Sequence, residues 1–254
     1  TQLGGDIDGG AASDYSGRSI SMNAAGTIVA IGADGNDANG SSSGHVRIYE
    51  YTSVSGSGTW TQLGGDIYGE AAYDYSGQSV SMNAAGTIVA IGANGNGSYS
   101  GQVRIYEYRQ YTQTDADADT YHYTSKIQDS TQTKALIITN NQQQPQVGNS
   151  YWTQLGGDID GEAQYDYSGW SVSMNVAGTI VAIGAYGNDG NGSSSGHVRI
   201  YEYTSGSGSG TWTQLGGDID GEAGSDYSGY SVSMNADGTI VAIGAYRNDA
   251  NGYD

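Results

Sequence analysis

Residues 153–212 read TQLGGDIDGEAQYDYSGWSVSMNVAGTIVAIGAYGNDGNGSSSGHVRIYEYTSGSGSGTW, and this stretch decides the fold because the chain repeats it. Its opening heptad, TQLGGDI, begins at Thr1, Thr61, Thr153 and Thr213. The underlying period is about 60 residues, which is typical of repeat architectures. We therefore interpret residues 1–254 as a single repeat array with units starting at 1, 61, 153 and 213, and with an insertion at 109–151 in the second unit.

Each unit carries the two-residue periodicity of β-strands. Ser19-Ile20-Ser21-Met22 alternates polar and apolar side chains, and a short turn separates it from the more apolar run 27–33. Val46–Tyr51 alternates again, and Trp60–Leu63 follows a Gly/Ser linker. Four antiparallel strands in about 60 residues are the content of one propeller blade. The sequence predicts an all-β repeat protein of about four propeller-type four-stranded blades.

The two ends of the array do not match a whole number of blades. The chain opens on a fourth-type strand, Thr1–Ile7, and it closes at Asp254 before any further copy of the VRIYEY strand. We therefore expect the last blade to be incomplete. A processed chain, a fragment of a longer array, and a blade completed by a neighbouring molecule remain open as explanations.

The insertion at 109–151 contains a β-prone apolar run. It is either a long surface loop with one hairpin, an arm that adds a strand to a neighbour, or a disordered segment. If it is an arm, its assembly residues are Leu136, Ile137 and Ile138.

Composition excludes several classes of function. Eight Lys and Arg against 27 Asp and Glu give a net charge of −19, which disfavours binding to nucleic acid and to anionic membranes. The apolar runs are too short for membrane insertion. The chain has no Cys, and its three His are spread without a Ser-His-Asp arrangement. We predict that the protein is not an enzyme, and that its repeated acids are structural.

The stretch from Tyr15 to Tyr51 resembles the FG-GAP repeat of integrin-alpha-type β-propellers. Ser16-Gly17 stands where the family has Phe-Gly, Gly32-Ala33-Asp34 where it has Gly-Ala-Pro, and Gly44-His45-Val46 matches its G-x-V strand. The resemblance implies an extracellular propeller, and family propellers have about seven blades. The family's calcium loop is here reduced to Asn23-Ala24-Ala25-Gly26, so calcium is not expected at that position.

A different acidic loop, DIDGEAxxDYSG, offers several oxygen ligands within a few residues. Calcium accepts six to eight such ligands in flexible geometry, whereas Asp side chains also cap turns through nearby backbone amides. Both interpretations remain open, and calcium is the one cofactor that we consider. The candidate ligands in the third and fourth units are Asp158, Asp160, Glu162, Asp166, Asp218, Asp220, Glu222 and Asp226.

Two further sets of residues are candidate sites. Asn39, Asn96 and Asn191 each begin an Asn-Gly-Ser sequon at one place in the repeat, and in a secreted eukaryotic glycoprotein they are the first glycan candidates. Trp170 and Tyr230 occupy a position that holds Arg18 and Gln78 in the other units. Aromatic rings stack on the apolar faces of sugars, so these two residues are candidate ligand contacts.

Near-identical repeats, open ends and the absence of a catalytic set favour a secreted or cell-surface building block. Each blade buries its faces against another blade, so the ends of an unclosed array are adhesive. The leading hypothesis is a non-enzymatic structural or adhesive protein that assembles with itself head-to-tail into a filament or surface layer. The alternative is a glycan-binding, lectin-like propeller module.

Overall fold

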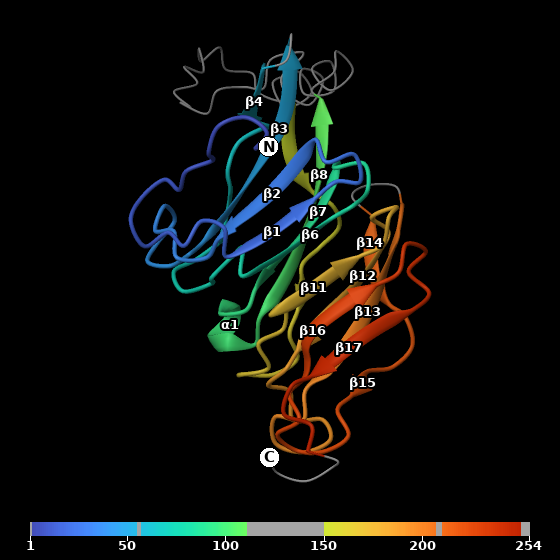
Figure 1. The fold of residues 1–254 in the computed structure, drawn as a ribbon. Helices are drawn as coiled ribbons and strands as arrows, with labels where there is room; N and C mark the ends of the chain where they lie inside the picture. The colour runs from blue at the N-terminus through green and yellow to red at the C-terminus, as the bar shows by residue number, and fades with distance from the viewer. Residues whose placement is uncertain (1, 55–56, 111–149, 207–209, 250–254) are drawn as a thin grey trace, which may run out of the picture.

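The computed structural model describes residues 2–54, 57–110, 150–206 and 210–249. It consists of three five-stranded antiparallel sheets and one two-stranded sheet, which follow one another along the chain (Figure 1). The one helical segment of these residues is the short turn α1 (Asn96–Tyr99). The prediction of an all-β array of propeller-type blades with an incomplete last blade is confirmed.

We name the four sheets blades 1 to 4. Blade 1 is β1 (Ser19–Met22), β2 (Ile28–Ala33), β3 (His45–Val54), β4 (Ser57–Gln62) and β5 (Ile67–Tyr68). Blade 2 is β6 (Ser79–Met82), β7 (Ile88–Ala93), β8 (Gln102–Gln110), β9 (Ser150–Gln154) and β10 (Ile159–Asp160). Blade 3 is β11 (Ser171–Met174), β12 (Ile180–Ala185), β13 (His197–Thr204), β14 (Thr211–Gln214) and β15 (Ile219–Asp220). Blade 4 is β16 (Ser228–Met234) and β17 (Val241–Ala245).

The fourth strand of each complete blade differs from the prediction of one continuous strand. In blade 1, β4 and β5 both pair with β3, and the Gly64-Gly65 dipeptide separates them. Gly64 has a φ of +76°, a left-handed conformation that favours glycine and ends the ladder. The same break separates β9 from β10 and β14 from β15.

The segment 2–7, expected as a strand of the fourth type, is not a strand. Its equivalents, such as β4 and β5, are strands because they pair with the third strand of their blade, and no described residue supplies such a strand here. The segment still lies in its usual place against the indole of Trp60, whose Nε1 donates a hydrogen bond to the Leu3 carbonyl at 2.9 Å.

The insertion in the second unit begins and ends inside a hairpin. The β8–β9 ladder extends to the Arg109↔Tyr151 and Gln110↔Ser150 pairs, so the first and last residues predicted for the insertion are paired strand residues. Residues 111–149 lie outside the described part of the chain, and so do Leu136, Ile137 and Ile138.

Between the first two strands of each blade, an asparagine organises a tight turn. Asn23 Oδ1 accepts hydrogen bonds from the backbone amides of Thr27 and Ile28 at 2.8 and 2.9 Å. Asn83, Asn175 and Asn235 make the equivalent pairs of bonds. The turn where the family places its calcium loop is therefore held by an amide side chain.

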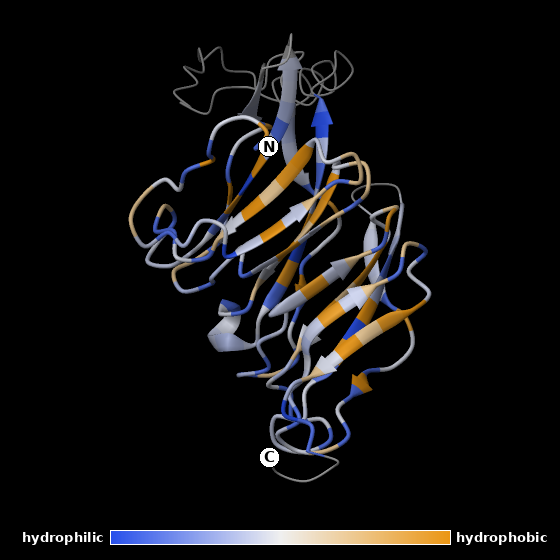
Figure 2. Cartoon of the chain, in the orientation of Figure 1, coloured by the Kyte–Doolittle hydropathy of each residue, from blue (hydrophilic) through white to orange (hydrophobic). Residues whose placement is uncertain are grey.

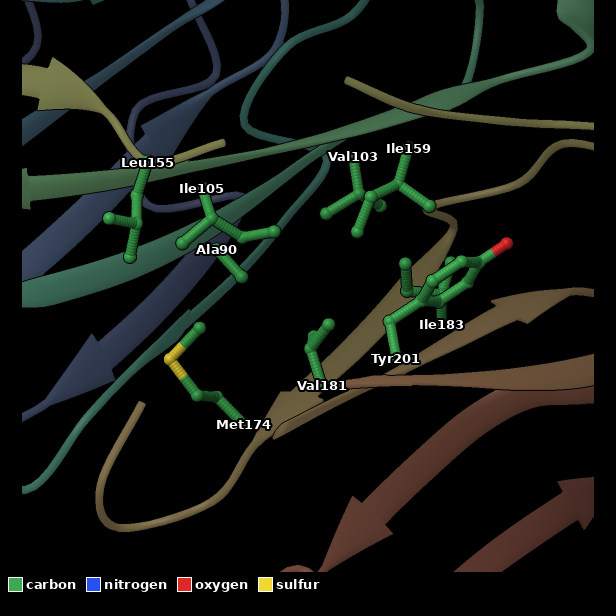
Figure 3. Packing of buried hydrophobic residues seen from close by; sticks show 9 residues of the cluster. All are labelled: Ala90, Val103, Ile105, Leu155, Ile159, Met174, Val181, Ile183 and Tyr201. Carbon is green, nitrogen blue, oxygen red and sulfur yellow. The ribbon is translucent and has the colours of Figure 1, made fainter. Parts of the chain in front are cut away.

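The hydrophobic core lies between blades. The first strands β1, β6, β11 and β16 pack in succession (Figure 1), and the strands alternate apolar and polar residues along their length (Figure 2). Ala90 and Ile105 of blade 2 meet Met174 and Val181 of blade 3 in one buried cluster (Figure 3). A second cluster joins blades 1 and 2. Each blade is thus stabilised by burial against its neighbours.

Glycine permits the close approach of consecutive blades. A Cβ at Gly92 in β7 would collide with the carbonyl oxygen of Gly169, just before β11. Gly32 and Gly184 face the carbonyls of Gly77 and Gly229 in the same way. This contact explains the glycine of the Gly-Ala pair that ends the second strand of each unit.

Candidate functional site

The last aspartate of the acidic loop caps a turn. Asp166 is buried, and its Oδ2 accepts hydrogen bonds from the Ala163 backbone amide at 3.0 Å and from Asn188 Nδ2 at 3.1 Å. Equivalent bonds to the backbone three residues upstream are made by Asp14, Asp74 and Asp226. These carboxylates are satisfied by local donors, as in other turns that Asp side chains cap.

The other acids of the loop point to separate partners. Asp158 Oδ1 accepts from Gln154 Nε2 at 2.6 Å, and Asp160 Oδ1 accepts from Gln102 Nε2 at 3.3 Å. In the fourth unit, Glu222 Oε2 accepts from Asn248 Nδ2 at 3.3 Å, and Asp220 ends β15. The four acids of one loop do not converge on a shared centre, and calcium binding by them stays a prediction.

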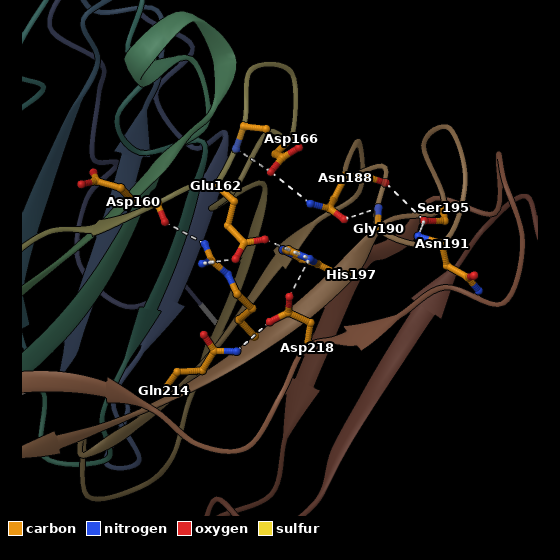
Figure 4. A network of polar contacts seen from close by, with 12 residues as sticks. Asp160, Glu162, Asp166, Asn188, Gly190, Asn191, Ser195, His197, Gln214 and Asp218 are labelled. Atoms are coloured by element: carbon orange, nitrogen blue, oxygen red, sulfur yellow. Dashed lines mark hydrogen bonds and ion pairs between the residues drawn. The ribbon is translucent and has the colours of Figure 1, made fainter.

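A different group of metal-capable side chains comes together in blade 3. Within the described ranges, Glu162, His197 and Asp218 alone bring three such ligand atoms within 4.8 Å of one another (Figure 4). Glu162 lies in the loop between β10 and β11, His197 begins β13, and Asp218 lies between β14 and β15. We call these three residues the His197 cluster.

The imidazole at the centre of the His197 cluster is deeply buried. His197 Nδ1 lies 4.0 Å from Glu162 Oε2 and 3.9 Å from Asp218 Oδ2. Burial, and then the charge of Arg199, lower the pKa of His197 below its ordinary value, so the ring is neutral at neutral pH. His197 was not among the candidate residues predicted from the sequence. The available signal was its position in the repeat, which holds histidine in the first and third units and Gln102 in the second.

The two aromatic ligand candidates lie side by side, as their shared position in the repeat predicts. The rings of Trp170 and Tyr230 are 5.4 Å apart, and Tyr186 contacts both. Tyr227 and Tyr246 complete this group, which we call the aromatic cluster. Burial, with the neighbouring tyrosines, raises the pKa of Tyr186 to about 12.

An open cavity of about 450 Å³ adjoins the aromatic cluster. Its walls include the rings of Tyr165, Tyr167, Tyr186 and Tyr227, together with the carboxylate-bearing Asp189. Flat rings beside polar groups at a cavity of this size are typical of small-ligand sites.

The three sequons do not share one structural position. Asn39 and Asn191 are equivalent, and each uses its Nδ2 to donate two hydrogen bonds to backbone carbonyls of the next unit. Asn96 instead occupies the place of Asn36 and Asn188, because the loop of the second unit is three residues shorter. Glycosylation stays a prediction, and a glycan on Asn39 or Asn191 would remove one of the two hydrogen bonds.

The two end faces of the array expose apolar side chains that the internal blades bury. Ile20 and Met22 of β1 form what we call the N-terminal face, and they are exposed. Ile240 and Tyr246, the residues on either side of β17, form the C-terminal face, and they are exposed as well. In blades 2 and 3 the equivalents of Ile20 and Met22, and in blades 1 and 2 those of Ile240, belong to or pack against the two clusters that join the blades.

Comparison with known proteins identifies the repeat. Residues 159–201, which run from β10 into β13 of blade 3, match the family model of the FG-GAP repeat. These residues are similar to an FG-GAP repeat. The resemblance seen in the sequence is thereby confirmed, and the FG-GAP match covers the Gly184-Ala185 pair and the loop with Glu162 and Asp166.

Other comparisons add little beyond the FG-GAP match. The chain is similar to the crystal structure of Sqt1 from Saccharomyces cerevisiae at 14% identity and a TM-score of 0.42. That match covers 85% of this chain and 39% of the other, so the chain spans well under half the length of Sqt1. No curated protein matches the chain. No helix among the described residues has the length and apolar character to cross a membrane.

Proposed function

We propose that the chain is a non-enzymatic, extracellular structural or adhesive repeat protein. It assembles head-to-tail with further copies of itself, into a filament or a surface layer, through the N-terminal and C-terminal faces. The observation that carries the proposal is that these two faces are the two sides of one interface, which the chain already forms three times between its own blades.

Three hydrogen bonds recur at each internal interface. At the junction of blades 1 and 2, Ser19 Oγ donates to the Gly77 carbonyl at 2.7 Å, and Met82 N donates to Ser21 Oγ at 2.9 Å. Ala24 N donates to the Ala84 carbonyl at 3.0 Å. The junctions of blades 2 with 3 and of blades 3 with 4 repeat all three bonds.

The two faces carry the matching halves of this set. Blade 4 presents Ser231 Oγ, Ser233 Oγ and the Ala236 amide, whose equivalents bond to the following blade. Blade 1 presents the Gly17 carbonyl, the Met22 amide and the Ala24 carbonyl, whose equivalents bond to the preceding blade. No described residue supplies the opposite half at either face, and a second copy supplies both.

The apolar groups of the two faces also match in shape. At the junction of blades 3 and 4, Ile180 packs on Gly238, where a Cβ would lie 2.8 Å from Ile180 Cδ1. Ile240, which occupies the position of Ile180 in the fourth unit, is 68% exposed. Its counterpart glycine, Gly26, has only Met22 Sδ near it, at 3.7 Å from a Cβ position. Burying Ile240 on Gly26 of a second copy removes both apolar surfaces from water.

Four observations support the remaining parts of the proposal. The similarity of residues 159–201 to the FG-GAP repeat favours an extracellular propeller without catalytic activity. A net charge of −19 is consistent with a soluble secreted chain, and the sequons fit the same compartment. The buried aspartates of the acidic loops are bound to backbone amides, which favours a structural use of these residues.

Sedimentation velocity between about 1 and about 100 µM chain tests self-assembly, since micromolar affinity corresponds to about 8 kcal/mol of binding free energy. We expect the average sedimentation coefficient to rise with concentration, and we expect ordered polymers in electron micrographs. A chain that sediments as a monomer over the whole range would contradict the proposal.

Glycan binding at the aromatic cluster is a second candidate function, favoured by the contacts of Trp170 and Tyr230 with Tyr186, whose ring lines the open cavity. A glycan array probed with the wild-type chain and with Trp170→Gln checks it. Glutamine stands at this position in the second unit, as Gln78, so the variant is compatible with the fold. Binding that is lost in Trp170→Gln supports a lectin, and an array without binding removes this candidate.

A further inference from the structure

We propose that the His197 cluster is a binding site for a divalent transition metal ion of the zinc class. The ion links the β10–β11 loop, the start of β13 and the segment between β14 and β15. This inference is independent of the proposed assembly. Glu162, His197 and Asp218 each contribute one ligand atom, and a solvent molecule completes the coordination at the exposed side of the site.

The imidazole carries the argument because it is buried without a partner. The side chain of His197 is 1% exposed, and neither of its ring nitrogens has a hydrogen-bond partner among the described residues. Nδ1 points at two carboxylate oxygens, at 3.9 and 4.0 Å (Figure 4). These separations are too long for hydrogen bonds, but atoms that each lie about 2.1 Å from one shared ion are about 3 to 4 Å apart.

Neighbouring side chains hold the carboxylates in a ligating orientation. Gln214 Nε2 donates to Asp218 Oδ1 at 2.7 Å, so that Oδ2 faces the imidazole. Arg199 Nη1 lies 3.5 Å from Glu162 Oε1, so that Oε2 faces the imidazole, and Arg199 is itself fixed by the Asp160 carbonyl at 2.7 Å. Groups that orient the ligands in this manner are a regular part of metal sites.

The donor set selects the class of metal. One imidazole nitrogen with two carboxylate oxygens suits Zn²⁺ and its first-row neighbours, whereas Ca²⁺ and Mg²⁺ prefer oxygen alone. The half-exposed side chain of Glu162 leaves room for a water ligand. The two carboxylates outweigh the charge of Arg199, and the net charge of −19 raises the local concentration of cations.

The other complete blades each lack one ligand and so provide internal controls. Blade 1 has His45 and Asp66, but Gly10 stands in place of Glu162. Blade 2 has Glu70 and Asp158, but Gln102 stands in place of the histidine. In blade 2 the carboxylates are held as in blade 3, by Arg104 at 3.5 Å and by Gln154 at 2.6 Å. Only blade 3 has all three ligands.

Isothermal titration of the untagged, chelator-treated full chain with Zn²⁺ tests the proposal. We expect one site, with an affinity that falls at least about tenfold in His197→Gln and in Glu162→Gln. The first variant copies Gln102 of blade 2, and the second keeps the shape of an exposed side chain, so both are expected to fold. Circular dichroism checks the fold of each variant.

The complementary variant adds a site. Gln102→His completes the ligand set of blade 2, and we expect the stoichiometry of Zn²⁺ to rise from one to two. Zn²⁺ should also raise the Tm of the wild-type chain and leave that of His197→Gln unchanged, because only an ion bound to the folded state stabilises it. A wild-type chain that binds no Zn²⁺, binding that survives in His197→Gln, or a stoichiometry that stays at one in Gln102→His would each overturn the assignment.

Discussion

Strands β1 and β6 have nearly the same sequence, SISM and SVSM, and opposite surroundings. Ile20 and Met22 of β1 are 69% and 51% exposed, whereas Val80 and Met82 of β6 are 8% and 7% exposed. The side chains and the pairing with the second strand are equivalent, so the difference comes only from the preceding blade that covers β6.

This comparison shows that the burial of a unit's apolar side chains is supplied by its neighbours. The residues that face outward from β1 are those that an internal interface uses, and the chain carries the matching half of that interface on blade 4. A surface with the composition and spacing of a buried one is typical of interaction sites, and this is the basis of the proposed assembly. The predictions that follow compare internal positions with their equivalents at the ends.

The largest expected effect is that of Met82→Ala. Removal of a buried methionine leaves a cavity and lowers the free energy of unfolding by about 2 to 5 kcal/mol. The equivalent change at the exposed end, Met22→Ala, should cost less than about 1 kcal/mol in the monomer. Urea unfolding of both variants at low protein concentration measures the difference. Equal losses would show that the N-terminal face is covered in the monomer.

Gly92 and Gly244 occupy the same position of the repeat, one inside the array and one at its C-terminal face, and they allow the same comparison of an internal position with an end position. Gly92→Ala forces a Cβ against the Gly169 backbone and should cost about 1 to 3 kcal/mol of unfolding free energy. At Gly244 a Cβ would approach only atoms of Ser231, the hydroxyl oxygen nearest, and no described residue of a further blade lies against it. Gly244→Ala should therefore leave the Tm of the monomer nearly unchanged, and it should weaken assembly. A large loss in Gly244→Ala monomers would contradict the account.

The cap made by Asp166 gives an effect of intermediate size. Asp166→Ala leaves the Ala163 amide and Asn188 Nδ2 without their acceptor, and it should cost about 1 to 3 kcal/mol. Asp237→Ala is the matched control, since Asp237 is an exposed acid in a turn. Thermal unfolding of the two variants in chelator measures the cost of the cap. A neutral Asp166→Ala would show that the carboxylate has another use.

The smallest expected effect is a pH dependence caused by His45. Burial, and then the charge of Arg47, lower the pKa of His45, while Asp66 and Asp14 raise it less. The unfolded chain, with a histidine pKa of about 6.5, therefore takes up a proton that the folded chain does not. The contribution of His45 to the free energy of unfolding is therefore fully present above about pH 7. It declines as the pH falls toward the lowered pKa of the imidazole in the folded state.

His45→Gln isolates this contribution, because Gln102 shows that the position accepts glutamine. The stability of the wild-type chain relative to His45→Gln should fall between pH 7.5 and 5.5, by about 1.4 kcal/mol for each unit of pKa difference once the pH is below both values. Chemical unfolding at both pH values measures it. Parallel profiles for the two chains would show that His45 does not titrate differently on folding.

The repeat and its two-residue periodicity were sufficient to predict the blades. Each strand follows from alternation, as in Ser19–Met22, and from turn residues such as Asn23. Two features were not predictable in this way. The split of the fourth strand depends on the conformation of Gly64, and the loss of strand structure at residues 2–7 depends on a missing partner strand.

The candidate sites were predictable only in part. The contact of Trp170 with Tyr230 follows from their shared place in the unit, because equivalent positions of adjacent blades are neighbours. The His197 cluster joins residues of two units across a sheet, so no local spacing indicates it. The acids Glu162 and Asp218 were candidates, but the sequence grouped each with the acids of its own loop because it could not show which loop folds onto β13.

The most direct test of head-to-tail assembly uses two variants, each with one blocked face. Ile20→Asp blocks the N-terminal face and Ile240→Asp the C-terminal face, and each variant alone should sediment as a monomer. An equimolar mixture retains one intact face of each kind, so it should form one-to-one dimers and nothing larger. A single variant that dimerises on its own, or a mixture that stays monomeric while the wild-type chain assembles, would contradict the account.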